Sequence, residues 1–434
     1  MGFIHEHIIL PLSDAVKGEQ VHANLRFLRK AEVWDEAQVK AFQDVKIREL
    51  IAYLAKEVPY YQEWFFNNHV NPAEIQTVED LRRLPIVNKA LMRSEGIERF
   101  AACGFPESKR MASRSSGSTG EPFSFYVSKE AYSVNMAAKL RTWYQAGYRL
   151  GDRYMKIANG ARHGRLKNLQ DWVNRCIYVP FYSINDDTLK GILDQIEKQK
   201  PSIIRSYPIP LYLLAQYRNN HPGYHFNPRH VMTTGSTLPA EYRKEIELAF
   251  GCDVIDSYSC EGTPNTYETP AHDGYHVTQV YGIIEVLDEQ DQPVTNGVGR
   301  VVSTDFWNLA HPFVRYDTQD LVEVVEGRIM RIMGRECESL IDLNGQRYTV
   351  HNFVGFFQEE DRPIKRSVVS YQVVKKKNQS IEFRLVVNDQ YNSSIEQYII
   401  DFWTQLLNVP VAVLIVDEIP LMNNNKRLTI IEES

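Results

Sequence analysis

The stretch Ser115-Ser116-Gly117-Ser118-Thr119-Gly120-Glu121-Pro122 carries much of the fold information in this chain, because two regular elements are expected directly after it. Residues 123–127 are typical of a strand, and residues 129–146 are typical of a helix. Small residues let a backbone approach a ligand closely, and clustered N–H groups and hydroxyls can surround phosphate oxygens. The loop lacks the Gly-Lys-Ser/Thr ending of a Walker A motif. A Ser/Gly loop can also be a plain turn, and this stretch alone leaves both interpretations open.

Short β-like runs alternate with helical stretches after this loop. The expected strands are 153–158, 177–181, 203–205, 230–234 and 253–257, and the expected helices are 187–199, 210–219 and 239–250. This alternation predicts an α/β layer architecture. From about residue 275 the pattern becomes β-rich, with candidate strands at 282–287, 299–304 and 321–325, and with turns at Glu326-Gly327 and Asn344-Gly345.

The two ends of the chain differ in pattern. Residues 34–56 have helical spacing that breaks at Pro59-Tyr60-Tyr61, and residues 77–83 resemble a short capped helix before Pro85. The tail combines strands and one helix, expected at 368–375, 381–387, 394–407 and 411–416. We therefore predict an α/β fold with a large N-terminal region, whose mixed sheets are flanked by helices, and a small α+β C-terminal unit.

Composition limits the classes of protein that are compatible with the chain. It has 434 residues, of which 43% are hydrophobic and 24% charged, as in a soluble globular protein of two to four units at roughly 100–200 residues per domain. The formal net charge is −6 and the pI about 6.1. This balance argues against a general nucleic-acid binder, which needs a basic surface to neutralise phosphates.

Cysteine usage and hydropathy bear on the compartment. The five cysteines are odd in number, widely spaced and form no CxxC pair, which suits a reducing compartment. Residues 1–11 have no basic segment before their short apolar run, and no run approaches the ~18 apolar residues of a membrane helix. We expect a cytoplasmic protein without a membrane partner, and the sequence gives no sign of its oligomeric state.

Three further segments have a recognisable pattern when they are taken with the Ser/Gly loop. They are Asp256-Ser257-Tyr258-Ser259-Cys260-Glu261-Gly262, the run from Ser303 to Asp320 with His311-Pro312-Phe313-Val314-Arg315-Tyr316, and Gly334-Arg335-Glu336-Cys337-Glu338 ahead of Arg347-Tyr348. In this order they resemble the core motifs of the adenylate-forming superfamily, in its phenylacetate–CoA ligase-like branch with the CapK-type proteins. The resemblance covers nearly the whole chain, including residues 57–61, 201–208 and 234–238.

The resemblance implies a nucleotide site. Tyr258 would pack on adenine, the Asp320 carboxylate would accept hydrogen bonds from the ribose hydroxyls, and Glu261 would hold Mg²⁺, which prefers carboxylate oxygen. Lys426 would neutralise charge on the α-phosphate during attack, as electrostatic transition-state stabilisation. The remaining implied nucleotide-binding residues are Ser115, Ser116, Gly117, Ser118, Thr119, Gly120, Ser236 and Arg335.

The resemblance also places an acid pocket along the helix after the loop and beside the segment before the adenine motif. Its candidate residues are Tyr132, Trp143, Tyr144, Tyr207, Pro208 and Ser236. Trp143 and Tyr207 would suit an aromatic or flat acid, although core packing explains such aromatics equally well. A set of four zinc ligands is conceivable from Cys252, Cys260, His272 and His276. Their spacing is not that of a recognised zinc site, and we favour no structural zinc.

The chain departs from the family pattern at four places. Glu121 stands where a lysine often follows the loop, and the tyrosine motif is shortened to Tyr258-Ser259-Cys260-Glu261. Gln319 and Asn425 replace glycines that often precede the aspartate and the lysine. A carboxylate beside a triphosphate costs energy unless it points away or meets a cation.

The function implied is ATP-dependent activation of a carboxylic acid to an acyl-adenylate, followed by transfer to a thiol such as coenzyme A or to an amine. Residues 1–338 would form the adenylation core and residues 339–434 a lid that rotates about a hinge at Glu338. Expected cofactors are ATP and Mg²⁺, with coenzyme A for a thiol acceptor. Two alternatives stay open: a degenerate nucleotide- or acyl-binding member without turnover, and acyl transfer to a carrier protein in polysaccharide or natural-product synthesis.

Overall fold

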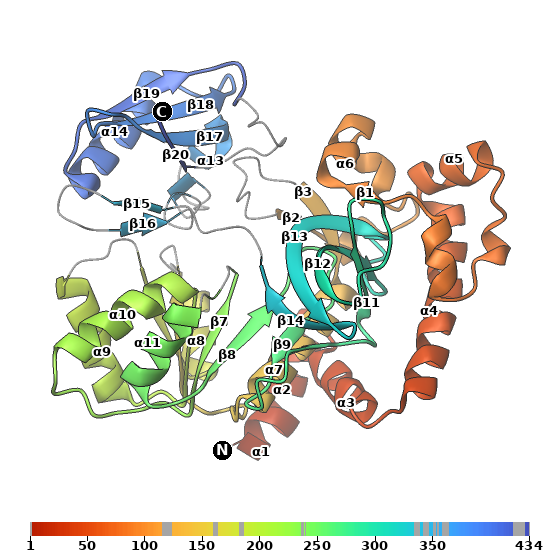
Figure 1. The fold of residues 1–434 in the computed structure, drawn as a ribbon, viewed down its shortest axis with the longest axis horizontal. Coiled ribbons are helices and arrows are strands. Elements are labelled where there is room, and N and C mark those ends of the chain that lie inside the picture. The colour runs from red at the N-terminus through yellow and green to blue at the C-terminus, as the bar shows by residue number, and fades with distance from the viewer. Residues whose placement is uncertain are drawn as a thin grey trace.

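The computed structural model describes residues 2–114, 124–158, 164–181, 186–235, 238, 240–333, 339–341, 347–349, 353, 356–357, 364–419 and 430–433. Their strands form a seven-stranded sheet, a five-stranded sheet, a four-stranded sheet and two hairpins. Figure 1 shows the first two sheets side by side and the third, with its helix, above them. Within the described residues, no helix has both the length and the apolar character that a membrane span requires.

The seven-stranded sheet has the order β10-β9-β8-β7-β6-β4-β5. Its strands are β4 (Tyr154–Ala158), β5 (Cys176–Pro180), β6 (Ile203–Ser206), β7 (His230–Thr234), β8 (Val254–Tyr258), β9 (Thr266–Glu268) and β10 (Tyr275–Val277). Strands β4 to β8 are mutually parallel, and β9 and β10 extend the sheet antiparallel. The expected βα alternation is confirmed, while β9 and β10 were not predicted.

Helices cover both faces of this sheet. Successive residues of a strand point to opposite faces, so Ile204 and Val231 pack on one side against α9 (Asp186–Gln199), α10 (Pro208–Asn220) and α11 (Ala240–Phe250). Ile203 and Met232 pack on the other side against α7 (Lys129–Gln145). Figure 1 shows α9, α10 and α11 together on the outer side of the sheet. The sheet is therefore buried on both faces, as in α/β proteins.

The five-stranded sheet has the order β1-β13-β12-β11, with β14 paired to β13. Its strands are β1 (Val87–Asn88), β11 (Gly282–Leu287), β12 (Gly297–Asp305), β13 (Tyr316–Val325) and β14 (Arg328–Ile332). Glu326 and Gly327, with φ of 51° and 76°, make the expected turn between β13 and β14. The shortest strand, β1, is the one parallel neighbour of β13 among these pairings.

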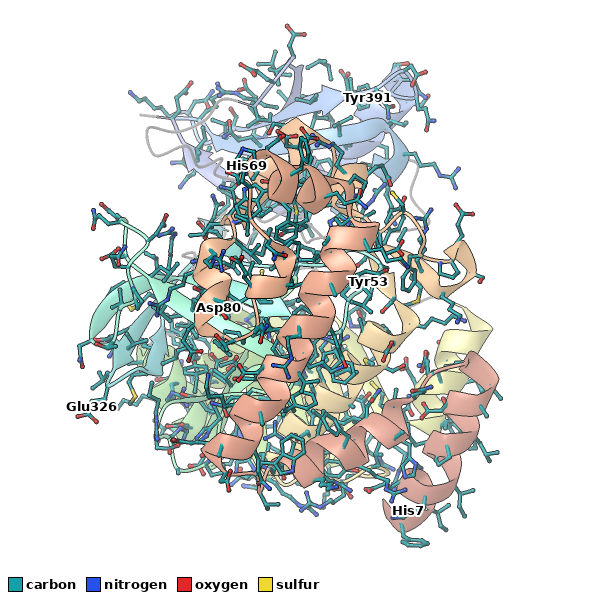
Figure 2. All side chains as sticks on the ribbon, turned by 90° about the vertical axis from the view of Figure 1, so that its right-hand side faces the viewer. His7, Tyr53, His69, Asp80, Glu326 and Tyr391 are labelled. Carbon is teal, nitrogen blue, oxygen red and sulfur yellow. The ribbon has the colours of Figure 1, made fainter. Side chains whose placement is uncertain are left out.

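Long helices of the N-terminal half pack on this sheet. Helix α4 (Glu36–Glu57) begins at Asp35, which forms a capping box with Gln38. Figure 2 shows α4 lying lengthwise along the side of the molecule, where the Tyr53 hydroxyl donates to the carbonyl of Leu309 at 3.1 Å. Pro59 ends the α4 pattern as expected, but it also begins α5 (Pro59–Asn67), since proline suits the first turn of a helix.

Several N-terminal elements were not predicted. They are α1 (Gly2–Ile4), η1 (His5–Ile9), α2 (Leu10–Lys17), α3 (Val21–Ala31), η2 (Pro72–Glu74), α6 (Lys89–Glu95), η4 (Ile97–Phe100), η5 (Glu107–Lys109), and α8 (Arg165–Val173) further along. The expected helix at 77–83 is a 3₁₀ helix, η3 (Glu79–Arg83). Helix α3 buries Leu25 and Leu28 against α7, so it completes the cover of the seven-stranded sheet. The hairpin β2 (Arg110–Arg114) and β3 (Ser124–Ser128) flanks the Ser/Gly loop.

The C-terminal unit is a four-stranded sheet in the order β19-β18-β17-β20. Its elements are α13 (Ile364–Ser367), β17 (Val368–Lys375), β18 (Ile381–Val387), α14 (Ser393–Leu407), β19 (Val411–Ile415) and β20 (Ile430–Glu432), beside the hairpin β15 (Ser339–Ile341) and β16 (Arg347–Thr349). Trp403 of α14 stacks on Phe353 at 4.5 Å and is 1% exposed. One buried cluster, with members between Leu340 and Ile430, forms its core. The predicted boundary at Glu338 and turn at Asn344-Gly345 lie outside the described residues.

Candidate functional site

Tyr258 ends β8 at the carboxyl edge of the parallel strands, where ligands bind in open α/β sheets. Its ring is 9% exposed and packs with Val301 and Val322 of the neighbouring sheet. Its hydroxyl donates to Oδ2 of Asp320 at 2.9 Å. Burial, and then the Asp320 charge, raise the pKa of the Tyr258 hydroxyl well above its usual value, so this group stays a donor. The contact joins the two sheets at the predicted site.

Asp320 lies on β13 where the pairing with β12 shifts register, as at a β-bulge. The hydroxyl of Thr318 donates to the carbonyl of Val301 at 3.1 Å and accepts from the N–H of Asp320 at 3.1 Å. Gln319 adopts a left-handed φ of 63° and is exposed. A bulge re-aims side chains, and here it turns the Asp320 carboxylate toward Tyr258.

Glu261 lies in the tight loop between β8 and β9. The hydroxyl of Thr263 accepts from the N–H of Cys260 at 2.6 Å and donates to its carbonyl at 2.8 Å. Gly262 has a φ of 72°, and a Cβ there would lie 2.4 Å from Cβ of Phe313. The half-buried Glu261 carboxylate accepts from the Cys260 thiol at 3.3 Å. The loop therefore holds a carboxylate three residues from Tyr258.

A buried polar network behind β8 was missed by the sequence analysis. Asp256 is 3% exposed and accepts from the hydroxyls of Thr233 at 2.5 Å and Tyr275 at 2.6 Å. Glu268 accepts from the N–H of Asp256 and pairs with Arg243 at 2.6 Å. Burial raises the pKa of Asp256. The signal for this network was an aspartate within the apolar strand 254–258, and its bonds fix the edge that carries Tyr258 and Glu261.

The acid-pocket candidates lie on α7 and at the start of α10. Trp143 packs edge-on against Tyr148 at 5.3 Å and Tyr154 at 4.9 Å, so it belongs to an aromatic cluster under α7. Tyr207 precedes the buried Pro208 at the first turn of α10. A Cβ at Gly235 would lie 2.7 Å from Cε1 of Tyr207, which shows that β7 and α10 meet closely at this ring. Tyr132 is half-buried on α7.

Nine of the predicted site residues cannot be placed. Ser115, Ser116, Gly117, Ser118, Thr119, Gly120, Ser236, Arg335 and Lys426 lie outside the described residues. Among the residues that are described, no group of three or more His, Cys, Asp or Glu side chains could hold a metal ion. The structure thus brings Tyr258 and Asp320 into contact, and Glu261 lies in the loop that follows β8.

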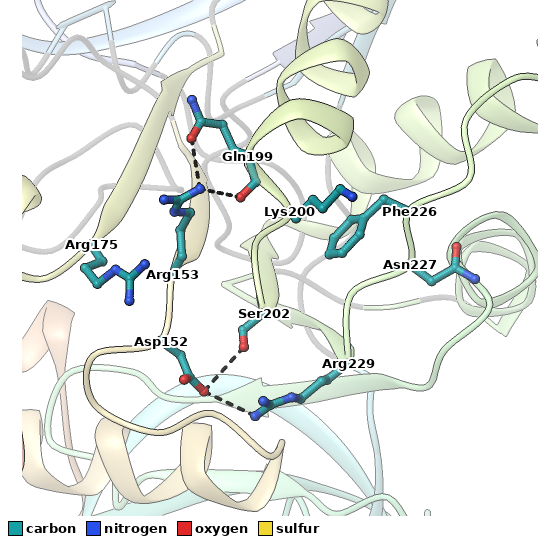
Figure 3. Close-up of a pocket in the computed structure, with 9 residues that line it drawn as sticks. All are labelled: Asp152, Arg153, Arg175, Gln199, Lys200, Ser202, Phe226, Asn227 and Arg229. Atoms are coloured by element: carbon teal, nitrogen blue, oxygen red, sulfur yellow. Dashed lines mark hydrogen bonds and ion pairs between the residues drawn. The ribbon is translucent and has the colours of Figure 1, made fainter. Parts of the chain in front are cut away.

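A separate pocket of about 470 Å³ lies at the opposite, amino edge of the parallel strands. Its cationic side chains mostly cap backbone carbonyls: Arg153 donates to Gln199 at 2.7 Å, and Arg229 donates to Gly147 at 2.7 Å. Figure 3 shows Arg153 on Gln199, and Asp152 between Ser202 and Arg229. Capping of the carboxyl ends of α9 and α7 accounts for these arginines, and the pocket lies away from Tyr258.

Comparisons with known proteins support the resemblance seen in the motifs. No family model matches the chain. Protein CapK of Staphylococcus aureus is 22% identical over 373 residues, which span 83% of this chain and 76% of CapK. Phenylacetate–coenzyme A ligase of Thermus thermophilus is 24% identical over 305 residues, spanning 67% of this chain and 66% of that protein.

The fold of this chain is similar to that of a solved enzyme structure. The 2-hydroxyisobutyryl-CoA ligase in the postadenylation state, with an acyl-AMP bound, superimposes with a TM-score of 0.57 at 17% identity, over 92% of this chain and 90% of that one. The chain therefore has the fold of the adenylate-forming ligases, and the predicted α/β fold class is confirmed. The resemblance to their phenylacetate–CoA ligase-like branch is likewise confirmed.

Proposed function

We propose that this protein activates a carboxylic acid with ATP, forming an acyl-adenylate and releasing pyrophosphate. One observation carries the proposal: the Asp320 carboxylate is fixed by Tyr258 at the carboxyl edge of β8, on a fold shared with acyl-AMP-forming ligases. In the reaction, a carboxylate oxygen of the acid attacks the α-phosphorus, and the bond between the α-phosphorus and the bridging oxygen breaks. The electron pair leaves with pyrophosphate.

Asp320 would accept hydrogen bonds from the ribose hydroxyls, since one carboxylate can accept from two neighbouring O–H groups. The hydroxyl of Tyr258 donates to Oδ2 of this carboxylate and so orients it at the carboxyl edge of β8. Most of the Tyr258 ring is covered by protein, so contact with adenine would use the small exposed part of the ring. The Ser/Gly loop, Ser236 and Arg335 would complete the nucleotide site.

Glu261 is the carboxylate that would hold Mg²⁺. It is half-buried, and a hard cation prefers carboxylate oxygen, so the side chain fits this role. When bound, Mg²⁺ supplies positive charge to the phosphate oxygens. Lys426 would add positive charge at the α-phosphate during attack.

We further propose that residues 339–434 act as a lid that moves about Glu338, bringing Lys426 to the site for adenylation and admitting the acceptor afterwards.

The acyl group would pass to the thiol of coenzyme A or to an amine, since both acceptors use the same adenylate. The relatives include Protein CapK and an enzyme named for ligation of phenylacetate to coenzyme A. The thiol or amine attacks the acyl carbon, and AMP leaves with its oxygen. The acid pocket would lie between α7 and the seven-stranded sheet, beside Tyr132, Trp143, Tyr207 and Pro208.

Acid-dependent exchange of labelled pyrophosphate into ATP tests the proposal, screened over aromatic, aliphatic, amino and sugar acids. We expect exchange with at least one class, and a loss of about 10- to 100-fold in Asp320→Asn, because a charged hydrogen bond is removed. Glu323→Gln, which changes a surface carboxylate of the same strand, is the matched control and should retain full exchange. ATP binding without exchange for any acid would contradict turnover and favour a binding protein.

A further inference from the structure

Two cations lie next to each other on the face of the seven-stranded sheet that α7 covers. Lys156 of β4 and Arg205 of β6 are direct partners in the parallel register, and neighbouring strands lie roughly 4.8 Å apart. Side chains at paired positions point to the same face. Tyr154, two residues before Lys156, packs in the cluster under α7, so Lys156 and Arg205 point toward that helix.

A third cation faces them from α7. Lys139 lies one turn before Trp143 on this helix, and i,i+4 residues share a face. The guanidinium of Arg205 lies 5.8 Å from the centroid of the Trp143 ring, which places it under this part of α7. Lys139, Lys156 and Arg205 are all half-buried. They form what we call the cation cluster.

Two charges of the cation cluster, those of Lys139 and Arg205, are not balanced by ion pairs with the residues that the structure describes. Within the described residues, neither Lys139 nor Arg205 makes an ion pair, and Arg205 is accompanied by the ring of Trp143. A cation–π contact is too weak to offset the cost of collecting like charges away from water. Burial, with repulsion from Arg205 and Lys156, lowers the pKa of Lys139 to about 8. Such a cluster is stabilised by an anion.

The cation cluster lies where the acid is expected. Tyr132, Lys139 and Trp143 recur at helical spacing on α7, and Tyr207 follows Arg205 by two residues at the carboxyl end of β6. The carboxyl ends of β6, β7 and β8 share one edge, and that edge carries Tyr258. An acid whose reacting carboxylate lies at the nucleotide would extend from this edge toward the cluster.

We propose that the acid activated by this protein carries a second anionic group, a carboxylate or a phosphate, which binds between Lys139 and Arg205. This inference rests on the proposed adenylation. The second group stays unreacted: Arg205 would donate two parallel hydrogen bonds to it, and Lys139 would add a point charge. The first carboxylate attacks ATP as described above. An acid with one carboxylate and an apolar tail would leave the charges of Lys139 and Arg205 uncompensated.

The test compares pyrophosphate exchange with acids matched in carbon skeleton, such as butyrate against succinate, pentanoate against glutarate, and 3-methylbenzoate against isophthalate, together with phosphorylated acids. We expect kcat/KM to be about 10- to 100-fold higher for a dianionic acid than for its matched monoacid. Arg205→Met and Lys139→Met should each lose that preference while keeping exchange with the monoacid. Lys190→Met, which removes an exposed lysine of α9, should keep the preference.

Calorimetry supplies a second readout that does not depend on turnover. Binding of the preferred dianionic acid at pH 8.5 should take up protons, because the anion raises the pKa of Lys139, and Lys139→Met should abolish this uptake. Exchange that favours monoacids, or an equal loss for both acids in Arg205→Met, would overturn the inference and leave adenylation standing. Exchange with no acid, together with no ATP binding, would overturn the adenylation proposal itself.

Discussion

The hydroxyl of Tyr258 donates to the carboxylate of Asp320 at 2.9 Å, and this bond links the seven-stranded sheet to the five-stranded sheet. The two residues lie 62 positions apart in the sequence. Tyr258 is held by the packing of its ring, and Asp320 by the bulge of β13. A carboxylate that is already fixed in this way would lose little side-chain entropy on binding a ligand.

We predict that Tyr258→Phe raises KM for ATP about 5- to 20-fold with a smaller effect on kcat, because Asp320 loses the donor that orients it. Asp320→Asn should cost more, and the double variant should cost less than the sum, since both changes remove one interaction. Steady-state kinetics of the four proteins checks this. Tyr224→Phe, whose hydroxyl contacts Asp194 at the surface, is the control. Additive losses would show that Tyr258 does not act through Asp320.

Arg315 should be a main contributor to stability. It is 4% exposed, pairs through two bonds of 3.0 Å with Glu285, and donates to the carbonyl of Leu84 at 2.8 Å. Arg315→Ala leaves Glu285, whose side chain is 14% exposed, without its partner and should lower the free energy of unfolding by about 3–5 kcal/mol in urea denaturation. Arg83→Ala removes an exposed pair with Glu74 and should cost less than about 1 kcal/mol. Equal costs would contradict this account.

Asp305 should make stability fall as the pH rises. Burial raises the pKa of Asp305 to about 6, against about 3.9 in the unfolded chain. Between pH 4 and 6 the folded state binds more protons, so the free energy of unfolding decreases by up to about 3 kcal/mol across this window. Asp305→Asn removes the charge while its side-chain oxygen can still accept from the N–H of Trp307.

The variant Asp305→Asn should therefore be more stable than the parent at pH 7 and similar to it at pH 4, as measured by urea denaturation at both values. Burial lowers the pKa of His311 to about 4, which acts in the opposite direction because the unfolded state then binds more protons below pH 6.5. That contribution is present in both proteins and cancels in their difference. A difference that does not change with pH would refute the raised pKa of Asp305.

Gly262 should tolerate no side chain. Its φ of 72° and the 2.4 Å approach of a Cβ to Phe313 mean that Gly262→Ala must shift the loop that carries Glu261. We expect a loss of stability of about 1–3 kcal/mol and a fall of at least about tenfold in exchange rate. Gly191→Ala in α9, where a Cβ meets nothing within 4 Å, should be neutral or stabilising by up to about 1 kcal/mol. Thermal denaturation and exchange assays of both variants decide the matter.

Local patterns predicted most of the fold, because most helices and strands have apolar residues at the spacing typical of their own secondary structure. The expected helix at 129–146 is α7, and the expected strand 230–234 is β7. Helix α3 was not predicted, although Val21, Leu25 and Leu28 have helical spacing. The motifs identified Tyr258 and Asp320 individually.

Contacts between distant segments could not be predicted in the same way. The bond from Tyr258 to Asp320 depends on how two sheets meet, and the pairing of Lys156 with Arg205 depends on strand order. Neither contact has a local sequence signature. A lysine or arginine in a strand, in particular, usually has a solvated tip, so its residue type does not indicate a buried charge. Gln319 adopts a left-handed φ of 63° in the bulge of β13, a conformation that glycine adopts more readily than other residues.

The most direct measurement follows oxygen from the acid to the nucleotide. An acid that supports exchange is labelled with oxygen-18 in its reacting carboxylate, incubated with ATP, the protein and an acceptor thiol or amine, and AMP is analysed by mass spectrometry. Adenylation predicts one labelled oxygen in AMP, because the carboxylate oxygen bonds to the α-phosphorus and leaves with AMP. Unlabelled AMP, or label in inorganic phosphate with ADP as the product, would contradict the account.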